Sequence, residues 1–191
     1  MKRVLTWALA LFLVAAPGCG GGTGRSPAPR PSLPQAGPAP EQPAGEAGIP
    51  TRNALITTMP AVAGMAPGTE FEFTLRGEFC TPLHQASGRI VYDPAVVQPL
   101  AVRRGELIPA GAVYLAKLDV TGFVPFAFTA LPGDAGIAPG RGELLRVRFR
   151  LLAEPPPGFR IRLLNDAAYL QLRTSGGGRL SFDLASEVVP Q

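Results

Sequence analysis

From residue 49 onward the chain consists of short runs in which apolar and polar residues alternate, separated by turns rich in Gly, Pro and Asp. Alternation with a period of two places the apolar side chains on one face of an extended strand. Ten such runs predict strands over 54–58, 70–76, 87–92, 98–103, 112–119, 123–130, 143–152, 159–164, 168–173 and 179–184. Short, regularly spaced strands of this kind are typical of an all-β sandwich or barrel.

Two of these runs show a buried face most clearly. In 70–76 the apolar positions are Phe71, Phe73 and Leu75, and polar residues stand between them. In 143–152 the inward set is Leu145, Val147, Phe149 and Leu151. No segment of this region has three turns of helical periodicity. About 140 residues in nine or ten strands bury a core without the help of disulfides.

The start of the chain has the form of an export signal. Lys2 and Arg3 precede an apolar run at 4–16, and small residues follow it, which predicts a secretory signal peptide over 1–18. The apolar run is shorter than the about 20 residues that a membrane-spanning helix needs. The residues before Cys19 resemble a bacterial lipoprotein signal, in which this cysteine carries the lipid. Ordinary cleavage at the same bond is the alternative.

The segment after the signal is predicted to be a disordered tether. Positions 17 to 50 contain nine Pro and eight Gly among 34 residues, and almost no large apolar side chains. Such a segment cannot bury enough surface to offset the entropy lost on ordering. At about 3.1 Å per residue, thirty Pro-rich residues would hold a domain roughly 90 Å from a membrane. We therefore expect a tether over 19–49 and one β domain over 50–191.

Charge and residue types argue against several function classes. With 18 basic and 14 acidic residues the net charge is +4, and two of the basic residues would leave with the signal peptide. Nucleic-acid-binding domains are far more basic on one face, so we expect no nucleic-acid partner. His84 lies near Ser87 and Asp93 but without the Gly-x-Ser-x-Gly turn of a hydrolase. One His with Cys80 lacks the ligand count of a zinc site. We expect a non-enzymatic domain without metal or cofactor.

Arginines gather on two consecutive predicted strands. Arg146, Arg148 and Arg150 occupy the outward face of one strand, and Arg160 and Arg162 lie on the next. If the two strands are paired neighbours, the five arginines form a cationic ladder that could contact anionic lipid headgroups, an acidic polysaccharide or an acidic protein. The alternative is a solvated face balanced by nearby acidic residues.

Several turn and core residues follow one another in a distinctive order. One strand ends in Tyr92-Asp-Pro94, the next leads to Gly105-Glu-Leu107, and Gly140-Arg-Gly-Glu-Leu144 opens a long strand. Ala66-Pro-Gly-Thr69 forms a turn before the first strong alternation. This order resembles a cohesin domain, and the resemblance covers most of 50–185.

The resemblance implies both a fold and a kind of partner. The implied fold is an antiparallel β-sandwich of nine to ten strands with jelly-roll topology, shared with some carbohydrate-binding modules. Cohesins bind dockerins, which are small calcium-loaded helical modules of polysaccharide-degrading enzymes. In the best-known type, an Asn-x-Asp before the Tyr-Asp-Pro turn supplies polar contacts, and here those positions hold Gln85 and Ser87 without the carboxylate. Gln85, Ser87 and Arg89 are therefore the candidate partner-binding residues.

Taken together, these features predict a non-catalytic, lipid-anchored binding module that docks a protein, dockerin-like or other, at the bacterial cell envelope. Gly20 after Cys19 favours the outer membrane or the cell surface. Two alternatives stay open. The chain could be a carbohydrate-binding envelope protein that uses the arginine ladder, or a structural envelope lipoprotein without a specific ligand.

Overall fold

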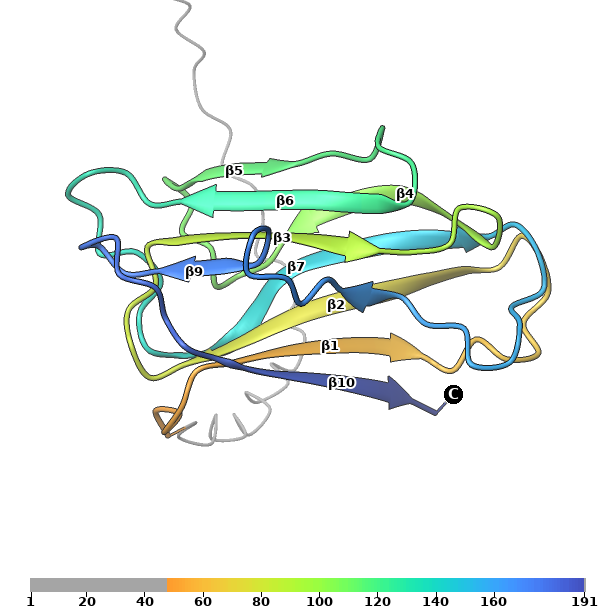
Figure 1. The fold of residues 1–191 in the computed structure, drawn as a ribbon, viewed down its shortest axis with the longest axis horizontal. Coiled ribbons are helices and arrows are strands. Elements are labelled where there is room, and N and C mark those ends of the chain that lie inside the picture. The colour runs from red at the N-terminus through yellow and green to blue at the C-terminus, as the bar shows by residue number, and fades with distance from the viewer. Residues whose placement is uncertain (1–47, 191) are drawn as a thin grey trace, which may run out of the picture. The chain divides into compact units, whose positions relative to one another are not determined.

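The computed structural model describes residues 48–190, which form a sandwich of two β-sheets (Figure 1). The predicted signal peptide, the lipidated Cys19 and nearly all of the tether over 19–49 lie outside the described residues, so these remain predictions. In the described part no helix is long and apolar enough to cross a membrane. The strands are β1 Ala54–Pro60, β2 Glu70–Phe79, β3 Gln85–Val91, β4 Val97–Arg104, β5 Val113–Ala116, β6 Phe123–Thr129, β7 Gly140–Leu151, β8 Arg162–Leu163, β9 Gln171–Arg173 and β10 Asp183–Val189.

The two sheets have different strand orders. One runs β10-β1-β2-β7-β4, and the other runs β5-β6-β3-β8, with β9 also paired to β3. All pairs are antiparallel except β1 and β10, which lie side by side and run in the same direction (Figure 1). The all-β sandwich prediction is confirmed, with this parallel pair as its one departure from antiparallel order among the described strands.

Alternation along the strands builds the core between the sheets. The predicted inward residues of β2 and β7 are all buried, and their register sets Phe71 opposite Phe149 and Phe73 opposite Val147. The second sheet contributes Ile90 and its neighbours from the facing side. Each such side chain stabilises the fold by about 1.5–3 kcal/mol when it leaves water. The inward positions that alternation predicts therefore form the core between the two sheets.

The turn after β3 also follows its predicted chemistry. Tyr92 is buried, and its ring meets Phe149 edge to face with 5.5 Å between centroids. The Asp93 carboxylate accepts a hydrogen bond from the backbone N–H of Ala95 at 2.9 Å, and Pro94 follows it. Asp at the start of a turn and Pro within it are the residue types that stop a strand and reverse the chain.

The strands near the C-terminus differ most from their predicted extents. The run 159–164 forms only the two residues of β8, and the strand predicted over 179–184 is instead β10 at Asp183–Val189. All seven side chains of β10 are exposed, so its sequence carries no buried face for alternation to reveal. Its place is set by backbone pairing with β1, whereas the apolar residues just before it, Leu180 and Phe182, pack against the core from an irregular segment.

Candidate functional site

The outward side of the β5-β6-β3-β8 sheet, together with β9, carries all three residues predicted to bind a partner. We call this surface the β3 face, and its central residues are Gln85, Ser87 and Arg89. Inward positions 86, 88 and 90 of the same strand are buried, so alternation directs these three side chains away from the core. Gln85 is exposed, and Ser87 and Arg89 are half-buried.

Neighbouring strands make the β3 face apolar around this polar row. On β5, Val113 and Leu115 are each 54% exposed. On β6, Phe123, Pro125 and Ala127 point outward and are half-buried. In the described part of the chain no further strand or helix is layered over this sheet. Contiguous exposed apolar side chains of this kind mark candidate interaction surfaces.

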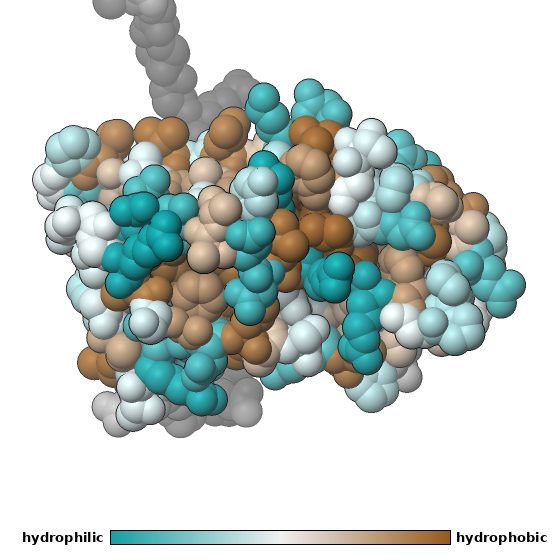
Figure 2. Space-filling view, viewed as in Figure 1, coloured by the Kyte–Doolittle hydropathy of each residue, from teal (hydrophilic) through white to brown (hydrophobic). Residues whose placement is uncertain are grey.

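A space-filling view shows how apolar and polar residues mix on the surface. Figure 2 shows one side of the molecule, on which several hydrophobic patches lie between separate hydrophilic groups.

Arg89 is flanked by two aromatic rings. Its guanidinium carbon lies 3.6 Å from the ring centroid of Tyr169 and 4.7 Å from that of Phe123. The hydroxyl of Ser87 donates to the backbone carbonyl of Tyr169 at 3.2 Å, which holds the Tyr169 segment against β3. The Arg89 side chain is therefore held by stacking, while the N–H groups of its guanidinium hydrogen-bond to no residue among 48–190.

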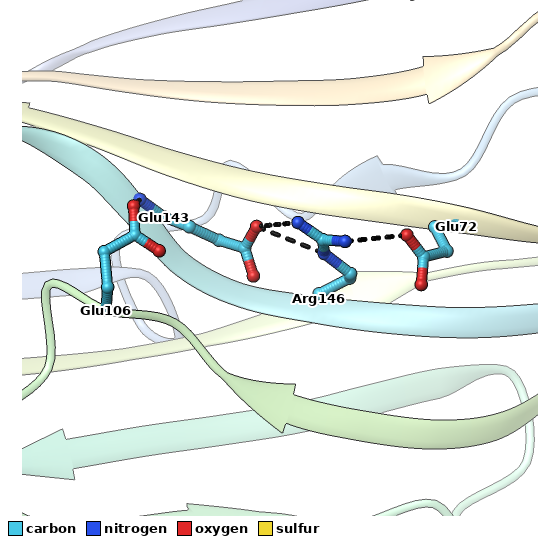
Figure 3. A network of polar contacts seen from close by, with 4 residues as sticks. All are labelled: Glu72, Glu106, Glu143 and Arg146. Atoms are coloured by element: carbon cyan, nitrogen blue, oxygen red, sulfur yellow. Dashed lines mark hydrogen bonds and ion pairs between the residues drawn. The ribbon is translucent and has the colours of Figure 1, made fainter. Parts of the chain in front are cut away.

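Arginines on the opposite sheet have different surroundings. Arg146 contacts Glu72 at 2.9 Å and Glu143 at 2.5 Å (Figure 3), and Arg150 contacts Glu70 at 2.6 Å. The hydrogen bond to Glu143 raises the pKa of Arg146, and that from Arg150 lowers the pKa of Glu70. We call this outward side of β2, β7 and β4 the β7 face. Arg146, Arg148 and Arg150 are thus paired with carboxylates.

A further carboxylate supports the same network. Glu106 follows β4 and accepts the backbone N–H of Glu143 at 2.9 Å, which lowers the pKa of Glu106 (Figure 3). This bond joins the end of β4 to the start of β7. Exposed ion pairs contribute little each, about 0–1 kcal/mol, so the network orders the side chains of the face more than it stabilises the fold.

The strand pairing on which the arginine ladder depended is not found in the structure. β7, which carries Arg146, Arg148 and Arg150, pairs with β2 and β4. Arg162 lies in β8 on the other sheet, where β8 pairs with β3, and Arg160 precedes that strand. The segment between β7 and β8, which contains three consecutive prolines at 155–157, crosses from one sheet to the other instead of turning back in the same sheet. The five arginines therefore form no common ladder.

The structure also bears on a possible metal site and on the thiol of Cys80. Among the described residues, no group of three or more His, Cys, Asp or Glu side chains is placed to hold a metal ion. Cys80 is half-buried, and its sulfur lies 3.4 Å from the Asn53 side-chain oxygen, which also accepts the Cys80 backbone N–H. This thiol belongs to the β1–β2 end of the sandwich and lies outside the β3 face.

Sequence reasoning missed the apolar residues that surround Arg89. The signal that could have found them is present in 123–130, where both alternating sets of positions are largely apolar, and at Val113 and Leu115 in the run 112–119. A strand that is apolar on both faces is covered on both faces. Tyr169 gave no such signal, because it lies in a loop far from Arg89 in sequence.

Comparison with known proteins identifies solved structures that have a similar fold. Neither protein-family models nor curated protein sequences match the chain. Among solved structures, it is similar to a type II cohesin from Bacteroides cellulosolvens, with 15% identity over 72% of this chain and 99% of the other, and a TM-score of 0.58. A non-cellulosomal cohesin from the archaeon Archaeoglobus fulgidus shows 14% identity over 72% and 91%, with a TM-score of 0.54. The chain has the cohesin fold.

Some of the similar structures are complexes. One of these is a type II cohesin–X-dockerin complex from Acetivibrio cellulolyticus, of which one chain is 15% identical over 73% of this chain and 100% of its own, with a TM-score of 0.58. The cohesin fold accounts for the jelly-roll sandwich that the sequence motifs predict. At such low identity the comparison concerns the arrangement of strands and not the side chains of the β3 face.

Proposed function

We propose that this cohesin-fold chain is a non-catalytic docking module that binds a protein partner on the β3 face. The observation that carries the proposal is the exposed apolar surface of that sheet, where Val113 and Leu115 lie on β5, two strands from the stacked Arg89 on β3. A side chain such as Leu115 gains about 25 cal/mol for each Å² of apolar surface that a partner covers. This gives the chain a physical reason to keep such residues exposed.

The similar structures support a protein partner over other ligands. One of them is described as a complex with an X-dockerin and others as complexes with dockerins. Gln85 and Ser87 occupy the positions at which the best-known cohesin type has Asn and Asp. The hydroxyl of Ser87 already donates a hydrogen bond to the backbone carbonyl of Tyr169. A dockerin-like module of different surface chemistry is therefore the partner that we propose.

The corrected strand pairing weakens the carbohydrate alternative. That alternative used five arginines as one cationic surface, but those on β7 face Glu70 and Glu72 on β2. Paired arginines have less free charge for an acidic polysaccharide. We therefore keep protein docking as the proposed function.

The proposed location follows from the N-terminal sequence. We propose that residues 1–18 are removed, that Cys19 is lipidated, and that 19–49 hold the domain away from the membrane at the cell envelope. Cys19→Ala is expected to move the chain from the membrane fraction to the soluble fraction of the cells that produce it. Equal membrane association of both chains, or mass spectrometry showing an unmodified Cys19, would contradict the lipid anchor.

Docking is tested by capture with matched surface variants. The immobilised chain is exposed to envelope and secreted extracts of its source organism, with calcium or with chelator, and bound proteins are identified. Leu115→Gln on the β3 face is expected to lose the captured partner. Leu184→Gln on β10, which is 37% exposed on the other sheet, should retain it. Equal capture by both variants would show that the partner uses another surface, and no capture by the unchanged chain would refute the proposal.

A further inference from the structure

We propose that the partner presents a carboxylate to Arg89, from an Asp or Glu side chain set among apolar residues. This inference rests on the docking function proposed above and names the chemistry of the docked surface. It commits the β3 face to an acidic protein partner.

The first observation is the charge of the two sheets. The strands of the β5-β6-β3-β8 sheet and β9 contain three arginines, Arg89, Arg162 and Arg173, and no Asp or Glu. The other sheet contains acidic residues on β2, β7 and β10, and Arg146, Arg148 and Arg150 on β7 each lie within 4 Å of a carboxylate. Among the described residues these three arginines are therefore paired with carboxylates, whereas Arg89 has no ion pair.

Acidic residues in the loops beside β3 do not form an ion pair with Arg89. Asp93 accepts the backbone N–H of Ala95 at 2.9 Å, and Asp166 accepts that of Ala168 at 2.8 Å. Both carboxylates thus serve the turns in which they lie. Within residues 48–190, Arg89 has neither an ion pair nor a side-chain hydrogen bond.

The second observation is the way Arg89 is held. A guanidinium is planar, so aromatic rings can stack on it while its N–H groups remain directed outward in its plane. With its centre 3.6 Å from the Tyr169 ring, Arg89 has the contact distance of such a stack. The N–H edge can then meet a carboxylate through two parallel hydrogen bonds.

Tyr169 is itself held in place. Its backbone carbonyl accepts the hydroxyl of Ser87, and its backbone N–H donates to the carbonyl of Asp166 at 2.9 Å. Because the ring and the arginine are ordered before binding, less side-chain entropy is lost when a partner docks. Ser87 is therefore a positioning residue for the Arg89 stack.

The apolar surroundings decide between two sources of carboxylate. A uronic-acid polysaccharide offers carboxylates but little apolar surface to cover Val113 and Leu115, which lie exposed on β5. A protein offers both kinds of group in one surface, with apolar residues beside an acidic one. The arrangement therefore favours a protein carboxylate.

The test uses a displayed library as the probe. A ribosome-displayed library of a helical scaffold with randomised surface positions is selected against the immobilised full chain. We expect the enriched binders to carry an Asp or Glu next to apolar residues. Arg89→Gln should weaken their binding about 10- to 100-fold, and Arg89→Lys should also weaken it because an ammonium cannot form the two parallel bonds. Arg148→Gln, an equal charge change on the β7 face, should leave it unchanged.

A complementary change guards against misfolded variants. The enriched acidic residue of the binder is replaced by its amide, and affinity for the unaltered chain should fall by a similar factor. Binders that depend on Leu115 but tolerate both Arg89→Gln and the amide change would overturn the carboxylate proposal while docking stands. Binders indifferent to Leu115→Gln and to Arg89→Gln would overturn both. Arg89-dependent binding of polygalacturonate, without acidic enrichment among the binders, would assign the site to a glycan and refute the protein carboxylate.

Discussion

Two tyrosines that pack in the core, Tyr92 and Tyr114, differ in whether the side-chain hydroxyl has a hydrogen-bond partner. Tyr92 donates to the backbone carbonyl of Val120 at 3.1 Å. The hydroxyl of Tyr114 is buried and hydrogen-bonds to no group of the described residues. Replacement by Phe removes the hydroxyl and little else, so the same change should have opposite effects at the two positions.

The expected magnitudes follow from the hydrogen bonds. Tyr92→Phe loses one bond and leaves the Val120 carbonyl without its donor, which lowers the free energy of unfolding by about 1 kcal/mol. Tyr114→Phe removes a hydroxyl whose burial is uncompensated, which raises the free energy of unfolding by about 1 kcal/mol. For a domain of this size each change corresponds to about 4 °C in Tm.

Thermal and urea unfolding of the two variants, followed by circular dichroism, measures both shifts. The unaltered chain is the reference for each variant. If Tyr114→Phe lowers Tm as much as Tyr92→Phe does, the Tyr114 hydroxyl has a hydrogen-bond partner and the reasoning from burial is refuted.

The same tyrosine predicts a dependence on alkaline pH. Burial raises the pKa of Tyr114 from 10.0 to about 12, because the charged phenolate is poorly solvated there. The unfolded chain thus ionises first, so this contribution to stability is complete below pH 10 and is lost as pH rises towards 12. Unfolding free energies between pH 9 and 12 should fall less steeply in Tyr114→Phe, and equal slopes would contradict the assignment.

Two further predictions concern the sheet that carries the β7 face. Gly105→Ala should lower stability by about 3 kcal/mol, because the new Cβ would lie 2.1 Å from the backbone oxygen of Glu143. Gly176→Ala has nothing within 4 Å and serves as the control in the same thermal measurement, where an equal loss would refute the packing argument. Because the hydrogen bond from Arg150 lowers the pKa of Glu70, its stabilisation is present above pH 4.5 and is lost as pH falls below it. Glu70→Gln should therefore flatten the acid limb of the stability profile, and an unchanged limb would refute that role.

Local patterning predicts much of the fold from sequence. The alternation of Phe71, Phe73 and Leu75 identifies a strand and its buried face, and Tyr92 with Asp93 marks the turn that ends β3. These features depend on the geometry of one strand, in which successive side chains point to opposite faces. They need no knowledge of neighbouring strands.

The candidate site shows where local reasoning ends. The cohesin resemblance leads to β3 and to Gln85, Ser87 and Arg89, and the structure places all three on one face. The sequence pattern does not reveal the aromatic stack on Arg89, because Phe123 and Tyr169 reach it from separate segments. Contacts between distant segments depend on strand order, which alternation leaves undetermined.

The arginines of β7 also show which features the sequence determines and which depend on the tertiary structure. Sequence alone determines that Arg146, Arg148 and Arg150 share the outward face of one strand, because they alternate with buried residues. Only the tertiary structure decides that this strand lies beside Glu70 and Glu72 on β2, while Arg162 lies in the other sheet. The physical reason is that backbone hydrogen bonds pair strands without regard to side-chain identity. The choice among neighbours is made by the packing of the whole core.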